Sequence, residues 1–444
     1  MAKIFKLEKP NLSAIDTKEL FSLALDKVNV GRLMHQTSFP EYIYWNKLKY
    51  KKLAKEFSPE KIWAILRFAR KIQSTQSVIK AENNKNFTWF SLPGLEEFFH
   101  QMDLNMGGHL FAGVKEFDEK QRFKFIARGI QEEAIATSQL EGANTTRKLA
   151  KQFLLEGRKP KTEAEHMVLN SYKTMQVIEK EYKNKKISLE SLFELHAMIV
   201  KNTVSSKEQG HFRTDKDEIV VRDYKYIYHI PPKVKFLKKE MDRLIKFAND
   251  QLGEPFIHPI IKAIMLHFWL AYLHPFTDGN GRLARLFFYW YLLRKGYWAF
   301  AYLPISSIIK RSPAQYRSAY VYSEQDDLDL TYFIDYNIRK IKLAAESFEK
   351  YAQEKSMENK IMNNFAKTEY KLNNRQIQLL QYYYNNKEEY TTPKMHMNLY
   401  QISKRTSIRD LQELKVAGFI APKTVKRNTY YYATKKIEKL FKGI

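Results

Sequence analysis

The sequence predicts a mainly α-helical protein with a β-hairpin near its middle and a smaller unit of helices and strands at its C-terminus. Two apolar runs, residues 260–273 and 286–293, contain no Gly or Pro and are typical of buried helices. Residues 219–230 carry aromatic and apolar residues in alternation and end at a Pro-Pro pair, which indicates a hairpin. After residue 375, helical patterns are followed by two strand-like segments around basic residues.

Length and composition restrict the class of protein. The 444 residues suggest about two to four domains. No apolar run of about 18 residues is free of charge, so we expect no membrane span. Met1–Asn11 alternates Lys with single apolar residues and lacks a signal-peptide core. The sequence has no cysteine, which excludes disulfides, thiolate catalysis and Cys-based zinc sites. We therefore expect a cytoplasmic protein.

The net charge is large and positive, +26 from 75 basic and 49 acidic residues. Such a charge favours acidic partners, most obviously nucleic acid or nucleotide. The chain is also rich in Lys, Asn, Ile and Tyr, which could reflect the base composition of a genome. The charge alone therefore does not decide between a functional and a compositional origin.

Residues 1–115 are expected to form an N-terminal helical lobe without catalytic residues. Ser58 is a suitable N-cap, with Pro59 at the first helical position and Glu60 in the first turn. The apolar stripe after it predicts a helix from about residue 59 to residue 80. Polar or Gly/Pro-containing breaks at 83–86 and 91–94 predict turns. The hairpin at 219–230 is the one clear strand signal in the first half of the chain.

Residues 116–352 are expected to form the largest domain. A long helix is predicted from about residue 118 to 142, with Gly142 as its stop signal. His196 lies on the apolar side of its helix and is expected to be structural. The hairpin is expected to turn near Asp223. Further helices are predicted at 162–183, 188–200, 233–252 and 331–351.

The two apolar helices are joined by a short loop, residues 274–285, that is dense in chemically active residues. Gly279 and Gly281 allow a sharp turn and present free N–H groups where the second helix starts. A helix N-terminus of this kind is an anion site. Arg282 and Arg285 are three residues apart and share one face of the first turn. Two guanidinium groups beside a glycine nest suit a polyphosphate.

Two further side chains complete this predicted site. Asp278 is a hard oxygen ligand placed to hold Mg²⁺ against the phosphates. His274 is the only residue of the loop that can take a proton near pH 7. Each feature also has an ordinary explanation: a plain turn, solvated arginines, a capping histidine. Their combination within twelve residues favours the catalytic interpretation.

The loop matches every position of the motif His-x-Phe-x-Asp/Glu-Gly-Asn-Gly-Arg-x-x-Arg, and the chain therefore resembles Fic-domain proteins. The resemblance implies a helical bundle that moves AMP from ATP to a Ser, Thr or Tyr hydroxyl of a target protein. In the family, the residue at His274 deprotonates the target, the one at Phe276 anchors the loop, and the one at Asp278 holds Mg²⁺. Gly279, Asn280 and Gly281 would form the anion hole, and Arg282 and Arg285 would contact the outer phosphates.

A second stretch also resembles this family. Thr137 to Gly142 fits the pattern Ser/Thr-x-x-x-Glu-Gly/Asn of the inhibitory helix. The resemblance implies that Glu141 pairs with Arg285 and blocks seating of the γ-phosphate. A carboxylate and a phosphate would compete for the same guanidinium fork. Taken alone, Glu141 would be an ordinary acid at a helix end, since so short a pattern often arises by chance.

The hairpin and the region after the motif complete the resemblance. Gly210-His211-Phe212-Arg213, the hairpin and the Pro-Pro pair occur in the order found in Fic proteins, where the hairpin is a flap that holds the target by strand addition. An ordinary surface hairpin is the alternative. Tyr316 is expected on the adenine side, where relatives carry Tyr-Tyr and this chain has Gln315-Tyr316. The flap residues expected to meet the target are Val221, Tyr224, Tyr226, Tyr228 and Ile230.

The C-terminal part is expected to be a linker, 353–374, followed by a winged helix-turn-helix domain, 375–444. Ser403 to Leu411 resembles the start of a recognition helix, and the strands that follow enclose a basic tip. Residues 360–444 carry 17 Lys or Arg and 6 Asp or Glu, a net charge of 17 − 6 = +11. This charge suits phosphate and groove contacts with DNA. Dimerisation or docking of the target is the alternative.

We therefore expect a protein adenylyltransferase that uses ATP and Mg²⁺ and is restrained by Glu141. A second interpretation keeps the fold and changes the donor or the direction, including removal of AMP. Kinase-type relatives carry Lys at the position of Gly281, which argues against a kinase. A third interpretation is a DNA-binding regulator that senses nucleotide. The target, which could be the protein itself, and a homodimeric state stay open.

Overall fold

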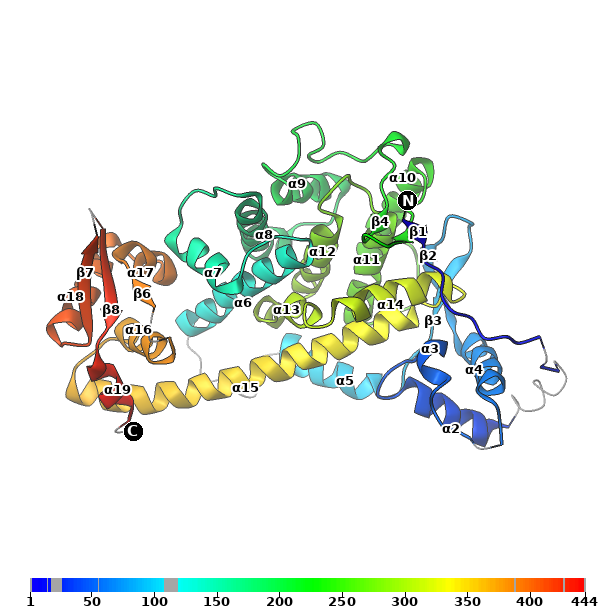
Figure 1. The fold of residues 1–444 in the computed structure, drawn as a ribbon, viewed down its shortest axis with the longest axis horizontal. Coiled ribbons are helices and arrows are strands. Elements are labelled where there is room, and N and C mark those ends of the chain that lie inside the picture. The colour runs from blue at the N-terminus through cyan, green and yellow to red at the C-terminus, as the bar shows by residue number, and fades with distance from the viewer. Residues whose placement is uncertain are drawn as a thin grey trace.

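The computed structural model describes residues 1–444 except 1, 14, 17–25, 55, 108–118, 387–388, 426–427 and 443–444. It is mainly helical and elongated, and the long helix α15 (Thr331–Glu369) runs along most of its length (Figure 1). The expected boundary at residue 115 and the basic residues Lys426 and Arg427 lie outside the described residues. Within the described part, no helix is both long and apolar enough to cross a membrane.

The N-terminal lobe contains helices and a small hairpin. Its elements are β1 (Lys3–Ile4), α2 (Lys27–Ser38), α3 (Trp45–Leu48), α4 (Pro59–Gln73), β2 (Thr75–Lys80), β3 (Asn86–Trp89), α5 (Leu95–Met102) and a π-helical turn (Asp103–Gly107). The side chain of Ser58 caps α4 by accepting a hydrogen bond from the N–H of Lys61 at 3.3 Å. The predicted N-cap is thus present.

The helix predicted from residue 59 to residue 80 was wrong after residue 73, where the chain forms a strand. The helix α4 ends at Gln73, and Ser74 is extended with ψ at 140°. The β-branched residues Thr75, Val78 and Ile79 favour extended backbone. The strand pairs with β3 through a turn in which Asn84 has φ at 62°. The hairpin at 219–230 is therefore not the only paired strand segment in the first half of the chain.

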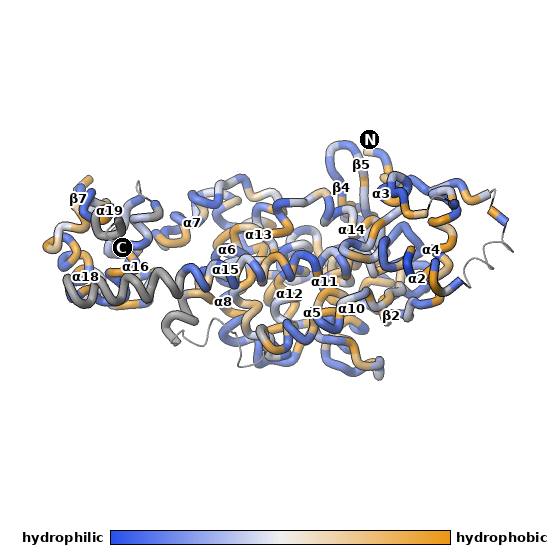
Figure 2. Tube along the Cα trace, turned by 90° about the horizontal axis from the view of Figure 1, so that it is seen from below, coloured by the Kyte–Doolittle hydropathy of each residue, from blue (hydrophilic) through white to orange (hydrophobic). Residues whose placement is uncertain are grey.

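The central part is a helical bundle. Its helices are α6 (Glu119–Leu140), α7 (Arg147–Glu156), α8 (Glu163–Lys180), α9 (Leu189–Ile199), α10 (Val234–Ala248), α11 (Pro259–Leu273), α12 (Asn280–Arg294), α13 (Ile305–Ile309) and α14 (Pro313–Gln325), with 3₁₀ turns at Tyr182–Asn184, Asp215–Asp217 and Trp298–Tyr302. Apolar residues gather in its middle around α11 and α12 (Figure 2). Nearly every residue of these two helices is buried.

A small sheet lies beside the bundle. The strands β4 (Val221–Arg222) and β5 (Tyr226–His229) pair antiparallel, and β1 adds to the other edge of β5 in parallel. Residues 221–229 therefore form the expected hairpin. One of its edges is occupied by the N-terminal segment of the chain, which the sequence did not indicate.

The C-terminal part has its own small core. Its elements are α16 (Asn374–Asn385), β6 (Tyr390–Thr391), α17 (Pro393–Tyr400), α18 (Lys404–Val416), β7 (Ile420–Val425), β8 (Asn428–Ala433) and α19 (Lys435–Lys442). The strands form one sheet in the order β6-β8-β7. The helices α17 and α19 and the short strand β6 were not predicted from the sequence. Because α15 continues to Glu369, the expected linker is largely helical.

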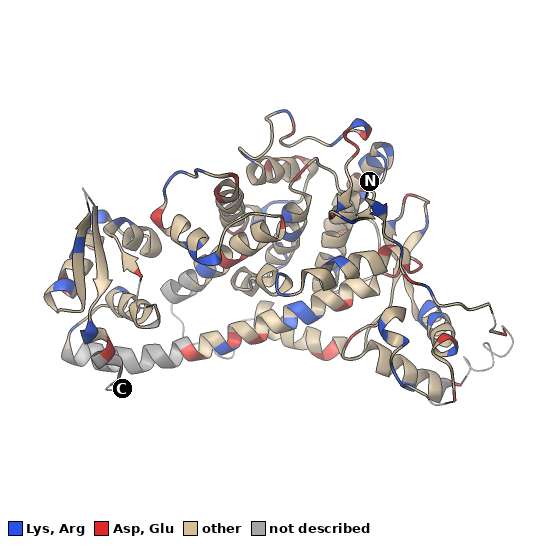
Figure 3. Ribbon diagram, in the orientation of Figure 1, with Lys and Arg blue, Asp and Glu red and all other residues tan. Residues whose placement is uncertain are grey.

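This C-terminal part touches the central bundle at the end of α7. Tyr390 Oη donates to Glu156 Oε1 at 3.1 Å, and Asn398 Nδ2 donates to Leu155 O at 3.1 Å. Basic residues occur in all parts of the described chain and do not gather on the C-terminal part alone (Figure 3). The large net charge is therefore a property of the whole chain.

Candidate active site

The predicted catalytic histidine stands at the end of a buried helix in an unusual conformation. His274 is the C-cap of α11 and has φ at 46°, in the left-handed region. Such backbone is uncommon for residues other than Gly and needs support from its surroundings. Arg213 supplies that support: its Nε donates to His274 O at 2.8 Å, and its backbone N–H donates to Pro275 O at 2.9 Å.

Burial favours the neutral form of the His274 ring. Burial, with smaller contributions from His229 and Arg213, lowers the pKa of His274 to about 3. Its Nδ1 lies 3.4 Å from Ala271 O, which leaves Nε2 as the nitrogen able to accept a proton. A neutral imidazole with one free nitrogen is the state that a general base requires.

The loop after His274 is held from inside. Phe276 is fully buried and stacks on the ring of His196, with centroids 3.7 Å apart. The side chain of Asn280 closes the turn: its Oδ1 accepts from Phe276 N at 2.9 Å, and its Nδ2 donates to Phe276 O at 2.8 Å. Both amide atoms of Asn280 are thereby used, so only its backbone N–H remains for an anion.

His196 also fixes the loop through hydrogen bonds. Its Nδ1 accepts from the N–H of Gly210 at 3.0 Å, so its Nε2 carries the proton and faces Asp278 O at 3.0 Å. Burial lowers the pKa of His196 to about 4 and keeps this arrangement neutral. His196 is structural, as expected, and the structure it supports is the motif loop.

The two glycines of the motif have different neighbours. Gly279 has φ at 79° and ends the loop, and a Cβ on it would come within 2.7 Å of Val200 Cγ1. A Cβ on Gly281 would collide with the carboxylate of Glu141, whose Cδ would be 2.7 Å away. The Glu141 carboxylate therefore lies directly against the first turn of α12, where the sequence predicts the anion site.

The two motif arginines are both buried but differ in their partners. Arg282 Nη2 donates to Asp278 Oδ2 at 2.9 Å, and Arg282 Nη1 donates to Ile199 O at 3.2 Å. Arg285 Nη2 donates to Glu141 Oε1 at 2.8 Å, and Arg285 Nε donates to Thr137 Oγ1 at 2.7 Å. Burial alone would lower the pKa of Arg285, but the charge of Glu141 raises it above its usual value.

The remaining predicted residues lie around this centre at different depths. Tyr316 is largely enclosed, and its Oη is 2.8 Å from His267 Nε2 and 3.2 Å from Tyr320 Oη. On the hairpin, Tyr224 is 96% exposed and Ile230 is 57% exposed. Gly142 follows Glu141 with φ at 93° and ends α6. The structure thus brings together Thr137, Glu141 and Arg285, and it leaves the hairpin tip at the surface.

Two positioning residues were not assigned roles from the sequence. Arg213 joins the motif loop to the segment before the hairpin, and His229 joins the hairpin to α11. His229 Nε2 is 2.8 Å from Tyr272 O, and its Nδ1 is 2.7 Å from Glu324 Oε2. The Gly-x-Phe-Arg stretch was a signal for Arg213, but nothing local in the sequence indicates the role of His229.

The side chains at this site suit a metal ion that binds together with the phosphates of a substrate. The described residues contain no group of three or more His, Asp or Glu side chains that could hold a metal ion by themselves. The side chain of Asp278 is 49% exposed and offers one carboxylate beside the anion site. Mg²⁺ is often held by one or two carboxylates together with substrate phosphates and water. Asp278 fits that mode of binding.

Comparison with known sequences identifies the domain. Residues 186–292 match the Fic/DOC family model. The protein adenylyltransferase Fic of Nematostella vectensis is 34% identical over 115 residues, which are 26% of this chain and 25% of that protein. The enzyme of the same name from Culex quinquefasciatus is 36% identical over 115 residues, 26% of this chain and 21% of that protein. The chain thus matches only about a quarter of the length of these relatives, and the resemblance to Fic domains is confirmed.

Two solved structures are also similar. A Fic family protein from Desulfovibrio desulfuricans G20 has a TM-score of 0.46 and 17% identity, covering 78% of this chain and 97% of that one. Fic-1 from C. elegans has a TM-score of 0.43 and 18% identity, covering 58% of this chain and 69% of that one. Both scores are below 0.5.

Proposed function

We propose that this chain, whose residues 186–292 form a Fic/DOC-family domain, is a protein adenylyltransferase held in check by Glu141. The reaction would move AMP from ATP to a Ser, Thr or Tyr hydroxyl of a target protein. The observation that carries the proposal is the contact between Arg285 Nη2 and Glu141 Oε1, at 2.8 Å, with the carboxylate against Gly281. A carboxylate in that place occupies the position that a phosphate would need.

Phosphate binding would use the start of α12. The free N–H groups of Gly279, Asn280 and Gly281 and the positive end of the helix favour an anion there. Arg285 would bind an outer phosphate once Glu141 has left, since one fork cannot serve both acceptors fully. Arg282, now held by Asp278 and Ile199 O, would support the site mainly through its charge.

Asp278 would hold Mg²⁺ together with the phosphates, and the ion would neutralise part of their charge. In the transfer itself, the target oxygen forms a bond to the α-phosphorus of ATP, and pyrophosphate leaves. His274 Nε2 takes the proton of the hydroxyl. The lowered pKa of His274, about 3, keeps this nitrogen available at neutral pH.

Target binding would use the hairpin as a flap. An extended target segment can add to the outer edge of β4 through backbone hydrogen bonds, because β5 is already paired with β1 on its other side. The exposed Tyr224 would contribute to the choice of target. Val221, Tyr226, Tyr228 and Ile230 complete the proposed flap, and Tyr316 is proposed on the adenine side.

A winged helix-turn-helix role for residues 375–444 is a separate proposal. It is supported by the order of helices and strands and by α18, which starts at the capping residue Ser403. Lys404, Arg405 and Arg409 are exposed near this start, where they could contact a DNA backbone. A DNA shift that weakens with salt would support this role, and a shift that ignores salt would contradict it.

The test of the main proposal is auto-modification with ATP and Mg²⁺, read by intact mass. We would compare the wild-type protein, Glu141→Gly, and Glu141→Gly combined with His274→Ala. We expect an added AMP mass that is largest in Glu141→Gly and absent in the double variant. An added phosphate mass would favour another transfer reaction, and equal modification of the wild type and Glu141→Gly would contradict the restraint.

A further inference from the structure

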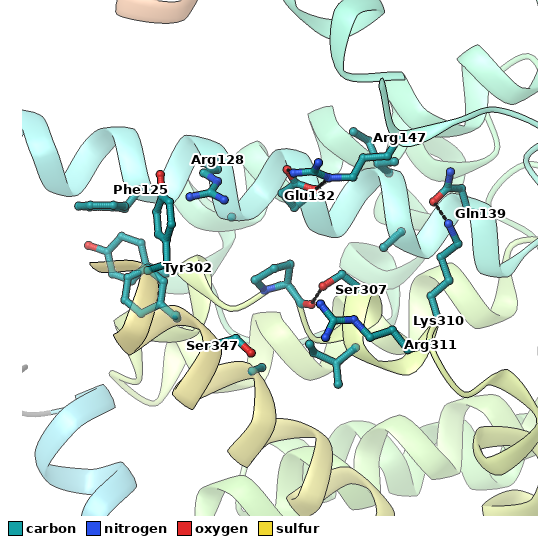
Figure 4. Close-up of a pocket in the computed structure, with 18 residues that line it drawn as sticks. Phe125, Arg128, Glu132, Gln139, Arg147, Tyr302, Ser307, Lys310, Arg311 and Ser347 are labelled. Atoms are coloured by element: carbon teal, nitrogen blue, oxygen red, sulfur yellow. Dashed lines mark hydrogen bonds and ion pairs between the residues drawn. The ribbon is translucent and has the colours of Figure 1, made fainter. Parts of the chain in front are cut away.

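A cavity outside the motif loop lies along the outer side of α6. It has a volume of about 430 Å³ and is bounded by α6, Arg147 of α7, the segment from Tyr302 to Arg311, and α15 (Figure 4). Sites for small molecules usually have volumes of about 300–1,000 Å³. The cavity is therefore large enough for a compact organic ligand, and none of the predicted site residues lines it.

The helix α6 separates this cavity from the catalytic loop. One side of this helix faces α12 and α13 and carries, at intervals of four residues, Glu133, Thr137 and Glu141. Glu133 accepts a hydrogen bond from Tyr289, and Thr137 and Glu141 accept from Arg285. Arg128, Glu132 and Gln139 belong to the other side of α6 and line the cavity. A ligand in the cavity would therefore contact the same helix that carries the proposed restraint.

One wall of the cavity is aromatic. The rings of Tyr302 and Phe348 stack with centroids 5.3 Å apart and planes at 11°. Phe125 meets them edge-on, at 6.4 Å from Tyr302 and 5.9 Å from Phe348. A flat ring of a ligand can pack against such a surface in offset or edge-to-face geometry.

The other lining groups are mostly cationic. Arg128, Arg147, Lys310 and Arg311 line the cavity, and Glu132 is the one acid among its lining residues. Arg147 is bound to Glu132. Arg128 has a buried Nη1 without a hydrogen-bond partner among the described residues, and its guanidinium lies 3.5 Å from the centre of the Tyr351 ring.

A buried guanidinium nitrogen without a hydrogen-bond partner is costly, and an anion beside the guanidinium would compensate for part of that cost. Burial lowers the pKa of Arg128, with an opposing contribution from Glu132, as expected for a cation that lacks a full partner. The side chain of Arg311 is exposed at the rim and has no hydrogen bond or ion pair with the part of the chain that the structure describes. Two guanidinium groups thus line the cavity that the ligand would occupy.

We propose that the cavity binds an organic anion with an aromatic ring and that this ligand is an effector that releases Glu141. The inference rests on the proposed restraint by Glu141. Lys310 Nζ donates to Gln139 Oε1 at 2.6 Å and so ties the last turn of α6 to the end of α13. An anion in the cavity competes for Lys310 and removes this tie, which leaves Gln139 with the bond from its Nε2 to Thr145 O at 2.7 Å and loosens the turn that leads to Glu141.

The middle of α6 would not move with it. Gly129 packs against the backbone of the 3₁₀ turn, where a Cβ would come within 2.7 Å of Tyr302 Cα. Close backbone packing of this kind resists displacement. The expected change is therefore local to residues 137–141 and does not require the whole helix to leave.

Binding can be tested with the full chain and the aromatic sulfonate 1-anilinonaphthalene-8-sulfonate as the probe. We expect saturable binding that is weakened about tenfold in Arg128→Gln and in Arg311→Gln, because each variant loses one charge-assisted hydrogen bond. Arg32→Gln, an exposed arginine of α2, is the matched control and should bind as the wild type does. Equal binding by all four proteins would overturn the site. Arg311 is exposed, so its variant should fold normally.

Release of Glu141 has a readout that does not need activity. With saturating probe, backbone amides of residues 137–141 should exchange hydrogen faster, whereas those near Gly129 should not change. Auto-modification should rise in the wild type and not in Glu141→Gly. Binding without faster exchange would overturn the effector role. If Glu141→Gly itself transfers nothing, the proposed function fails, while the exchange result still decides whether the ligand moves the end of α6.

Discussion

The hairpin β4–β5 is joined through His229 to α11, the helix that leads into the motif loop, yet the hairpin and the loop are held in opposite ways. In the loop, Phe276 is fully buried and both amide atoms of Asn280 are bonded. In the hairpin, Tyr224 is 96% exposed, and the turn is held by Asp223, whose Oδ1 accepts from Tyr226 N at 2.7 Å. The loop proposed to carry out the transfer is buried and fixed by hydrogen bonds, whereas the hairpin proposed to select the target is exposed at its tip.

Among the substitutions that test this comparison, the largest effect is expected for the loss of transfer on replacing His274. In the Glu141→Gly background, His274→Ala should lower transfer about 10²–10⁴-fold, since a general base supplies that much. ATP binding, measured by calorimetry, should remain. His35→Ala, an exposed histidine on α2, should leave both unchanged. Transfer that survives in His274→Ala would remove this residue as the base.

The next largest effect is expected for Phe276, the buried side chain that anchors the loop. Phe276→Ala should lower the free energy of unfolding by about 3–5 kcal/mol, because a fully buried ring is replaced by a cavity. Phe256→Ala, at a ring that is 86% exposed, is the matched control and should change stability by less than about 0.5 kcal/mol. Denaturant titration measures both values, and similar losses would show that Phe276 does not anchor the loop.

The pH dependence tests how strongly the loop keeps its histidine neutral. Because burial lowers the pKa of His274 to about 3, transfer by Glu141→Gly should not fall between pH 7 and pH 5, as it would with an ordinary histidine near 6.5. An acid limb centred near pH 6.5 would mean that the ring is protonated more readily than its burial suggests.

The same shift makes the fold sensitive to acid. A histidine whose folded pKa lies below its unfolded value contributes stability above pH 6.5, and this contribution is lost as the pH falls towards the folded pKa. His196, with a pKa lowered by burial to about 4, acts in the same direction. The denaturant concentration at the midpoint of unfolding should therefore fall as the pH is lowered below about 6.5. The fall should be less steep in His274→Gln.

The smallest effect is expected at the hairpin tip. Tyr224→Ala should leave the stability within about 0.5 kcal/mol of the wild type, because the side chain is almost fully exposed. It should change the rates of transfer to different targets unequally. Tyr50→Ala, at a tyrosine that is 78% exposed in the N-terminal lobe, should change neither. A large loss of stability in Tyr224→Ala would break the contrast between loop and hairpin.

The same contrast explains what could be predicted from the sequence. The motif residues lie within twelve positions, so the loop and its glycines could be predicted from their spacing. The partner of Arg285 is far away in the chain, and a short pattern around Glu141 was enough to suggest it. The inward turn of Asn280 could not be foreseen, because it depends on the two backbone groups of Phe276.

Other features had no local signal. The strand Thr75–Lys80 follows an amphipathic helix without a Gly or Pro between them, so a helical pattern appeared to continue through it. The role of His229 depends on contacts with Tyr272 and Glu324, which are distant in sequence. A strand of two residues such as β1 leaves no periodicity to detect.

The pairing of β1 with β5 has a consequence for how the chain folds. The N–H of Phe5 donates to Ile227 O at 2.8 Å, and Gln325 Nε2 donates to Phe5 O at 3.0 Å. Residues 3–5 are made before residues 225–227 and Gln325, and they must wait for these partners before they can pair. Contacts of such high sequence separation form late, because closing a long loop costs entropy before any bond forms. Completion of the hairpin sheet by β1 is therefore expected late in folding.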